Sequence, residues 1–407
     1  MLETTQPRIV IVGGGFGGLA AAIELQQHGF TDLTILERGP DIGGTWFYNS
    51  YPGAACDVPS HLYSFSYAQR RDWSRLCSPQ AEILAYLHAV AHDYGVDRLV
   101  VPGTEVGSCA WDDAARRWTV TSTDGRAWDA DAVVLATGQL HQPSYPRPVK
   151  AAIQRLPGLQ AHRRAYIFEY TESLTLAIRH PNSFGRVVRA MSTAFMRRQL
   201  TDPVIRRKAW PDYTFGCKRI LFSSSFLPAL QRPNVELVTE PLERMTPTGL
   251  VTVDGTAHEV DCIIYGTGFR TTEFMFPMEI TGGGGMSLRE AWAAGPHAHF
   301  GMVVPGFPSL FMMYGPNTNT SGGSIIVYLE AQASYLRQAL QQVRDRGAAA
   351  IDIRPEVEAE SDRLVQARFA GTAWTRCDSW YRDEHGRIVT NWPGSFFATS
   401  PKPARSV

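Results

Sequence analysis

Residues 8–37 read RIVIVGGGFGGLAAAIELQQHGFTDLTILE, and the first nucleotide site is predicted from this stretch. The apolar run 8–12 predicts a short buried strand, and residues 19–27 predict a helix that ends near Gly29. A second strand over 33–36 then leads to Glu37. Strand, glycine turn, helix, strand and acid follow one another in the order of a dinucleotide-binding βαβ unit.

Each glycine of the turn has a distinct task in such a unit. Gly13 permits the tight turn, Gly15 lets the backbone approach a pyrophosphate, and Gly18 lets the helix pack closely on the strand. The free N–H groups of the helix N-terminus attract phosphate. Phe16 within the turn and Arg38 beside the acid complete the predicted contacts of this site.

Glu37 limits the choice of nucleotide. It lies 19 residues after Gly18, where a carboxylate accepts hydrogen bonds from ribose hydroxyls and repels a 2′-phosphate. The residues therefore indicate FAD or NAD at this site. An ordinary glycine-rich turn is the structural alternative, and the ordered flanking elements favour the nucleotide site.

Composition sets broad limits on the class of protein. The length of 407 residues predicts two or more domains. The net charge of zero argues against a nucleic-acid partner. The six cysteines form no CxxC pair, so we expect free thiols in a reducing cytoplasm and neither disulfides nor a zinc site. A leader peptide and an apolar run long enough for a membrane span are not found in the sequence.

Two further motifs carry a resemblance to a known family. GGTW at 43–46 and YPGAACDVPSHLYSFS at 51–66 resemble the flavin-containing monooxygenase superfamily, and in particular the type I Baeyer–Villiger monooxygenases. The resemblance covers about residues 1–146 and 213–395, and it implies FAD as the cofactor. The flavin contacts that it implies are Gly44, Thr45, Trp46, Asp57, Val58, Tyr63, Thr137, Gly138, Gly315 and Asn317.

The resemblance also implies a reaction. In the family, reduced FAD and O₂ give a C4a-peroxyflavin that attacks a ketone and yields an ester. The segment GCKRI at 216–220 matches the one that carries the family's catalytic arginine, here Arg219, and Asp57 matches the aspartate that orients it. An arginine at this place stabilises developing negative charge. An inherited structural ion pair is the alternative interpretation.

One expected part of the family pattern is missing from the sequence. We find neither a second glycine-rich nucleotide turn nor the FxGxxxHxxxW signature after residue 146. The chain is therefore expected to have an α/β, Rossmann-like fold of the two-dinucleotide-binding-domain type, with a truncated second domain and a helical insertion. The expected parts are an FAD-binding domain in two pieces (1–146 and 269–407), a helical segment (147–212) and a remnant of the NADPH-type domain (213–268).

This departure leaves NADP(H) doubtful and the electron source open. A separate flavin reductase, reduction by the substrate itself as in an FAD oxidase or dehydrogenase, and a flavin without a redox role are the three alternatives. The partners expected are O₂ and a small or medium organic substrate. Loss of part of the second domain would widen the cleft above the flavin for a bulky substrate, which suggests a biosynthetic role.

Local patterns predict the remaining elements. We expect Ser78 to cap a helix that ends at Gly95, and a long helix to lie along 329–343 before Gly347. Strands or strand ends are expected at 118–122, 132–135, 234–238 and 261–269.

Two charged features remain outside this scheme. The segment 150–208 holds 12 basic and three acidic residues, which predicts a solvated helical face, with a docking face for an acidic partner or anionic lipid as the alternative. His297 and His299 alternate as a metal pair would, but no further ligand is near in the sequence, so we expect ordinary loop residues and no metal.

Overall fold

A computed structural model describes residues 6–138, 169, 172–221, 223–266, 271–275, 277–320, 323–383 and 385–394. Its centre is a sheet of five strands in the order β12-β7-β1-β2-β3, in which every neighbouring pair is parallel. The strands span Ile9–Val12 (β1), Leu33–Leu36 (β2), Val100–Val101 (β3), Ala132–Leu135 (β7) and Leu310–Met312 (β12).

The two faces of this sheet bury different side chains. Alternation along β1 sends Ile9 and Ile11 into a core shared with helices, and Val10 and Val12 into a core shared with a second sheet. Helices α1 (Phe16–Gln27), α3 (Gln80–Asp93) and α10 (Ile325–Arg346) contribute to the first core. The parallel sheet is thus covered on both faces, which explains its nearly continuous apolar strands.

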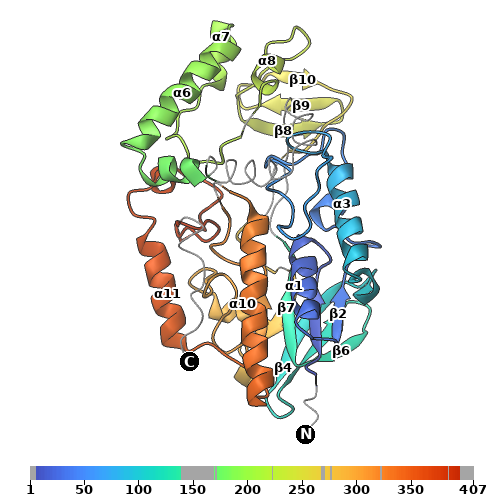
Figure 1. The fold of residues 1–407 in the computed structure, drawn as a ribbon. Coiled ribbons are helices and arrows are strands. Elements are labelled where there is room, and N and C mark those ends of the chain that lie inside the picture. The colour runs from blue at the N-terminus through green and yellow to red at the C-terminus, as the bar shows by residue number, and fades with distance from the viewer. Residues whose placement is uncertain are drawn as a thin grey trace.

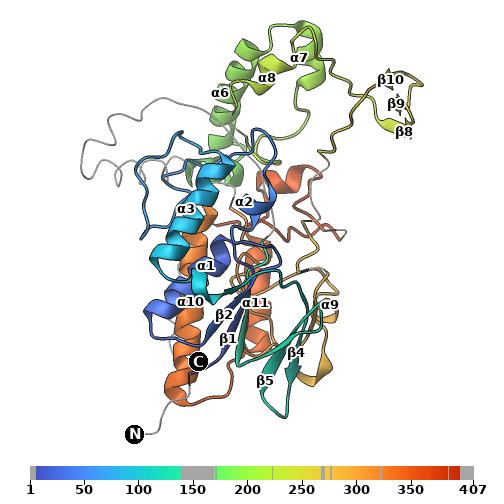
Figure 2. The ribbon, with the colours of Figure 1, turned by 90° about the vertical axis from the view of Figure 1, so that its right-hand side faces the viewer.

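The second sheet has the order β11-β4-β5-β6. Its strands are Val106–Asp112 (β4), Arg117–Ser122 (β5), Ala127–Ala130 (β6) and Glu279–Thr281 (β11). In Figure 1, α10 runs beside α1, and Figure 2 shows both helices on the side of β1 and β2 away from β4. The remaining elements of this part of the molecule are Thr45–Tyr48 (α2), Asp97–Leu99 (η1), Gly283–Gly285 (η2), Leu288–Ala291 (α9), Pro355–Ala367 (α11) and Ala373–Arg376 (η3).

A separate group of elements, which we call the upper group, lies at the end of the molecule opposite the N-terminus (Figures 1 and 2). It contains a helical run over 172–179 and the helices Phe184–Gln199 (α6), Pro203–Ala209 (α7) and Phe226–Ala229 (α8). An antiparallel sheet follows, with strands Leu242–Thr246 (β8), Gly249–Thr252 (β9) and Ala257–Glu259 (β10).

The predicted elements around the nucleotide turn are confirmed. β1, β2 and β7 lie where the apolar runs indicated, and the first helix begins three residues earlier than expected, at Phe16. The long C-terminal helix is also confirmed, and it ends at Gly347 with a φ of 60°. Helix α3 starts at Gln80 with Pro79 at its N-cap, so the prediction of Ser78 as the cap was wrong. The Ser78 hydroxyl accepts a hydrogen bond from the Ser60 hydroxyl instead.

Two strand predictions in the upper group were wrong. Residues 234–238 have no strand, and neither do the described residues of the 261–269 segment; Thr267 to Phe269 lie outside the described residues. Ile264 is 90% exposed and Tyr265 is 64% exposed. Apolar strands of this kind form when a parallel neighbour supplies hydrogen bonds and cover. In the part that the structure describes, these two segments have no such neighbour.

In the predicted helical segment 147–212, residues 172–179, 184–199 and 203–209 are helical, and residues 147–168 and 170–171 lie outside the described residues. Within the part of the chain that the structure describes, no helix combines the length and apolar composition needed to cross a bilayer.

Candidate functional site

The carboxyl ends of β1, β2, β7 and β12 meet at one edge of the parallel sheet, and most predicted site residues follow these ends. Gly13 comes after β1, Glu37 after β2, Thr137 after β7 and Gly315 after β12. Ligands of open parallel sheets bind at this edge. Parallel pairing is therefore what gathers residues more than 300 positions apart.

The glycines of the first turn are required by close backbone contacts. Gly13 has a φ of +109°, and a Cβ there would lie 2.5 Å from the Ala136 carbonyl oxygen. A Cβ at Gly18 would lie 1.9 Å from the Gly13 carbonyl oxygen. Side chains at Gly13 and Gly18 would therefore push β1, β7 and α1 apart, as expected from the sequence.

Gly15 has a different environment. It is the N-cap of α1, no side chain caps that helix, and a Cβ at Gly15 would meet only Gly44, at 3.6 Å from its Cα. Gly44 faces it with a φ of +50°. The helix N-terminus thus opens onto a concave surface of backbone between two glycine segments. This surface fits a pyrophosphate, because it offers unpaired N–H groups and carries no Cβ in the space that the phosphates would occupy.

Glu37 lies at the rim of this cradle and is 4% exposed. Its Oε2 accepts a hydrogen bond from Gly14 N (2.7 Å), and its Oε1 accepts from Gly39 N (2.7 Å) and from the Tyr48 hydroxyl (3.2 Å). These donors hold the carboxylate in place, and an ionised carboxylate has about four acceptor positions, so capacity remains for a ribose hydroxyl. The residues present therefore fit an adenosine diphosphate group of FAD.

Arg38 lies beside Tyr48, next to the rim of the cradle. Its guanidinium lies 5.0 Å from the centre of the Tyr48 ring and 3.7 Å from Glu105, and its side chain is 60% exposed. The hydrogen bond to Tyr48 raises the pKa of Arg38. Arg38 thus adjoins Tyr48, which donates a hydrogen bond to Glu37, and a contact of Arg38 with FAD stays a prediction.

Aromatic side chains continue the site from the cradle. The Trp46 indole donates a hydrogen bond to the Tyr63 hydroxyl (3.3 Å), and Phe16 packs edge-on against the Tyr63 ring at 5.2 Å. Burial raises the pKa of Tyr63 well above its ordinary value. Thr45 begins α2 immediately before Trp46. Nearby, the Val58 backbone N–H contacts Cys56 Sγ at 3.3 Å, which fixes the start of the Asp57 segment.

Arg219 and Asp57 form the ion pair that the sequence predicted, across 162 positions. Arg219 donates from Nε (2.9 Å) and from Nη2 (2.6 Å) to one oxygen of Asp57, Oδ2. The Asp57 side chain is 13% exposed and that of Arg219 is 34% exposed. The charge of Asp57 raises the pKa of Arg219, so the guanidinium stays protonated. Arg219 therefore presents a fixed positive charge that solutes can reach.

Tyr381 and Tyr314 surround this pair. Burial raises the pKa of Tyr381 to about 12 and also raises that of Tyr314, and the positive charge of Arg219 opposes both shifts. The two phenols are therefore neutral hydrogen-bonding groups at physiological pH. Tyr314 donates from its hydroxyl to Asn319 Oδ1 (3.0 Å), within the loop after β12.

That loop is held by the C-terminal segment. Asn317 has a φ of +55° and donates from Nδ2 to the carbonyl oxygens of Ile388 (2.7 Å) and Asn391 (2.9 Å). Its backbone N–H donates to the Val389 carbonyl. The N–H donors of Asn317 are thus used within the protein. At Gly315 a Cβ would lie 2.3 Å from the Gly301 carbonyl oxygen, so both predicted residues shape the loop.

Thr137 and Gly138 follow β7 at the same sheet edge. The Thr137 hydroxyl lies 3.1 Å from Met275 Sδ, and Gly138 has a φ of +75°. Gln332 was not identified from the sequence. It accepts a hydrogen bond from Tyr314 N (3.0 Å) and donates to the Phe300 carbonyl (3.2 Å). A polar residue among the apolar positions of the long helix was the available signal.

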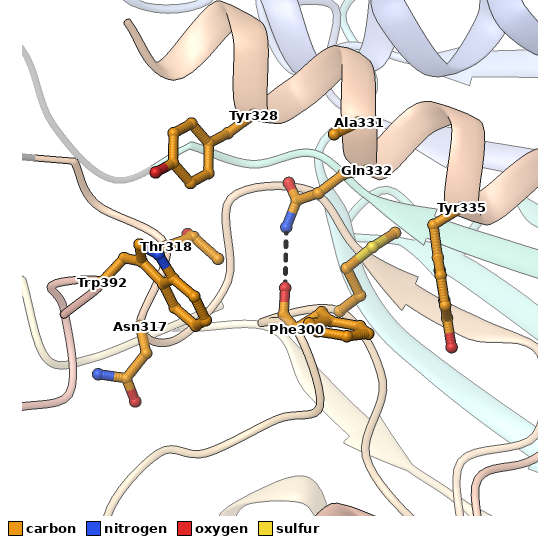
Figure 3. Close-up of a pocket in the computed structure, with 9 residues that line it drawn as sticks. Phe300, Asn317, Thr318, Tyr328, Ala331, Gln332, Tyr335 and Trp392 are labelled. Atoms are coloured by element: carbon orange, nitrogen blue, oxygen red, sulfur yellow. Dashed lines mark hydrogen bonds between the residues drawn. The ribbon is translucent and has the colours of Figure 1, made fainter. Parts of the chain in front are cut away.

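A partly open pocket lies beside this loop (Figure 3). Tyr328, Gln332 and Tyr335 of α10 form one wall, and Trp392 closes it from the C-terminal segment. Gln332 bridges the pocket by its hydrogen bond to Phe300. The remaining lining is Met302, Asn317, Thr318 and Ala331. An apolar wall with few polar groups suits an uncharged organic molecule.

The expectation of free cysteines throughout was wrong. Cys217 and Cys377 form a disulfide across 160 positions. Cys217 is buried and lies two residues before Arg219, while Cys377 precedes Trp380 and Tyr381. Widely separated cysteines have no spacing motif, so only the folded chain brings this pair together. Among the described cysteines, Cys56, Cys109 and Cys262 are free thiols.

The two histidines have separate environments. His297 contacts Glu358 of α11 at 2.9 Å, and this hydrogen bond raises the pKa of His297. Burial lowers the pKa of His299. Among the described residues, His, Cys, Asp and Glu side chains gather nowhere in a group that could hold a metal ion.

Comparisons with known proteins place this site in a family. Residues 11–78 match the model of the NAD(P)-binding Rossmann-like domain. A Baeyer–Villiger monooxygenase of Streptomyces coelicolor is 35% identical, over 95% of this chain and 89% of that protein. One of Pseudomonas aeruginosa is 31% identical, over 95% and 88%.

The fold is also similar to that of a solved monooxygenase. The solved structure of an oxidized steroid monooxygenase bound to NADP matches with a TM-score of 0.83 and 25% identity, covering 97% of this chain and 96% of that one. The sequence motifs, the cradle and these relatives agree. The chain therefore belongs to the Baeyer–Villiger monooxygenase family of FAD-dependent oxidoreductases.

Proposed function

We propose that this chain oxygenates a small or medium organic ketone to an ester at a bound FAD, with Arg219 and Asp57 as its catalytic pair. The observation that carries this proposal is the ion pair itself. Two N–H groups of Arg219 bond to Asp57, and a guanidinium has five. The partly exposed remainder can donate to an oxygen that becomes negatively charged during the reaction.

The residues that would hold FAD are those of the cradle and its aromatic extension. Gly13, Gly15 and Gly18 supply the backbone surface, Glu37 the ribose acceptor, and Trp46 with Tyr63 the wall of the ring site. When bound, the flavin supplies the redox chemistry with O₂.

Asp57 has a positioning and electrostatic task in this proposal. Its single oxygen fixes two edges of the guanidinium, and its negative charge keeps Arg219 protonated. Arg219 thereby meets the substrate oxygen as a preorganised cation, which avoids reorganisation during the reaction. Tyr381, which is 2% exposed, limits the access of water on its side of the pair.

We further propose that the second nucleotide domain lacks its first half, so that 147–212 is a helical segment and 213–268 a remnant. Three observations support this. The 35% identical relative aligns over 463 positions, more than the 407 residues of this chain. The segments 234–238 and 261–266 have no strand, and Ile264 is 90% exposed.

Loss of that half would remove the place where NADPH binds, so reduced flavin would come from a separate flavin reductase. A similar steroid monooxygenase was solved with NADP bound, which makes direct reduction by NADPH the competing proposal. A widened cleft on this side would admit a bulkier, biosynthetic substrate.

Anaerobic mixing of the FAD-loaded protein tests the electron source. We expect slow bleaching of the flavin by NADPH alone, fast bleaching with an added flavin reductase, and an oxygenated product after O₂ is admitted. Fast bleaching by NADPH alone would show that the domain is functionally complete. Bleaching by a ketone or alcohol substrate would establish a substrate-reduced oxidase. A flavin that neither NADPH, an added reductase nor a substrate reduces would indicate a flavin without a redox role.

A further inference from the structure

Helix α6 carries an apolar stripe on its solvent side. Phe184, Val187, Met191 and Phe195 are spaced by three or four residues, so they share one face of the helix. Their exposed fractions are 42%, 57%, 67% and 45%. A helix of a water-soluble domain normally turns such a stripe toward the core. The core side of α6 is instead marked by Gly185, its one buried residue.

The charges around this stripe all have one sign. Arg198 lies three residues after Phe195 and borders the stripe, whereas Arg186 and Arg197, 11 residues apart, lie together farther round the helix on its polar side. Helix α7 adds Arg206, Arg207, Lys208 and an exposed Val204. From 184 to 209 the chain holds seven basic residues and one acid, Asp202. Asp202 caps α7 by accepting from the N–H groups of Val204 and Ile205.

The position of α6 matches this composition. Figures 1 and 2 show α6 and α7 at the end of the molecule opposite the N-terminus, and α6 lies along its border. With 16 residues, the helix is about 24 Å long. From Phe184 to Phe195 the stripe extends along about 17 Å of this outer helix.

We propose that α6 and α7 dock this protein on the surface of an anionic phospholipid bilayer. A helix with exposed Phe and Met on its apolar side and Arg on its polar side lies in the headgroup region of a bilayer, with the apolar side inserted. Anionic headgroups attract nearby Lys and Arg. A second copy of the chain is the poorer occupant, because seven basic groups would face seven others.

Docking at this place would bring the upper group of elements to a membrane that dissolves apolar ketones. This consequence rests on the proposed function, whereas docking itself does not. The two are separable because vesicle binding is measured without turnover.

Vesicle sedimentation of the FAD-loaded full-length chain tests the proposal. We expect binding to phosphatidylcholine vesicles that contain phosphatidylglycerol, much weaker binding to phosphatidylcholine alone, and a loss of binding at about 0.5 M salt. The double variant M191E/F195E should bind at least about tenfold more weakly, and so should R197E/R198E. L364E, which changes an exposed leucine of α11, is the matched control and should bind normally.

An environment-sensitive dye gives a second readout that does not depend on a charge change. The dye is attached to Met191→Cys in a Cys262→Ser background, because Cys262 is the exposed free thiol among the described cysteines. Its emission should shift to the blue with anionic vesicles. No vesicle binding, equal binding to both lipids, or normal binding by M191E/F195E would overturn the proposal. Self-association lost in M191E/F195E, without vesicle binding, would assign the stripe to a protein interface instead.

Discussion

At the scale of the residue, the glycines of the cradle differ in what a side chain would meet. Gly18 faces the carbonyl of Gly13 at a distance that excludes any Cβ, so its role is packing. Gly15 faces open space next to Gly44, so its role is access for the ligand. The same residue type therefore serves stability at one position and FAD binding at the other.

G15A is expected to weaken FAD binding at least about tenfold while leaving the apoprotein folded, because its Cβ occupies only ligand space. G18A should destabilise the fold itself by about 1–3 kcal/mol, because the helix must move away from the strand. Flavin titration and thermal melts of the apoproteins measure the two effects. Equal losses in both variants would contradict the distinction.

Arg219 is the residue on which the proposed chemistry depends. R219A should lower the rate of ester formation by about 10²–10³-fold, since one preorganised donor to the oxyanion is lost. FAD content should stay unchanged, because Arg219 bonds to Asp57 and not to the cradle. R219K keeps the charge and is the matched comparison. Ester formed at the normal rate by R219A, with reduced flavin supplied, would remove Arg219 from the mechanism.

At the scale of the element, two long-range links hold the C-terminal segments on the site. The Cys217–Cys377 disulfide joins the Arg219 segment to the turn that leads to Tyr381. The His297–Glu358 contact joins the loop before β12 to α11. Both links connect segments far apart in the sequence, and each depends on a chemical condition, redox state or pH.

C217S is expected to lose about 2–5 kcal/mol of stability relative to the oxidised protein, because a loop of 160 residues is no longer closed in the unfolded state. C377S and treatment with a dithiol should have the same effect. C262S is the control, since that thiol is exposed and unpaired. Denaturant melts measure the change, and equal stability of C217S and oxidised wild type would exclude the link.

The His297 contact predicts a pH dependence. The pKa of His297 is raised by Glu358, so the contact stabilises the fold fully below the unfolded value of 6.5 and is lost as pH rises through the raised value. The melting temperature should therefore fall above about pH 6.5, and H297N should flatten this part of the profile. H92N, which changes an exposed histidine, is the control. A profile unchanged in H297N would refute the assignment.

At the scale of the whole molecule, one sheet edge gathers the cradle and the loops around it, while the upper group of elements lies apart from it (Figure 2). The parallel sheet is covered by helices on one face and by a second sheet on the other. The proposed loss of half a domain therefore leaves the FAD site structurally supported and changes only what faces it.

Excess FAD should stabilise the chain against heat by about 2.7 kcal/mol at 100 times its dissociation constant. NADP⁺ at millimolar concentration should give no stabilisation if the second domain is incomplete as proposed. Differential scanning fluorimetry of the apoprotein and holoprotein measures both. A clear shift with NADP⁺ would mean that the dinucleotide has a binding site, and the truncation proposal would then be wrong.

Local patterns were sufficient where the chain forms its own surroundings. The first 37 residues predicted β1, α1, β2 and the place of Glu37, because glycine contacts and apolar periodicity act over a few residues. The Arg219–Asp57 pair was predicted only through the family resemblance, since 162 residues separate the partners. Strands at 234–238 and in the described residues 261–266 were predicted wrongly because their apolar composition matches a strand whether or not a neighbour exists.

The sequence by itself determined the nucleotide cradle and the strands around it, and the charged pair was predicted only through the resemblance to the family. Only the tertiary structure decided that Cys217 bonds to Cys377, that Asn317 donates its hydrogen bonds to the C-terminal segment, and that α6 exposes an apolar face. The physical reason is the same in each case. Burial and pairing are properties of which segments pack together, and a single stretch of chain does not contain its neighbours.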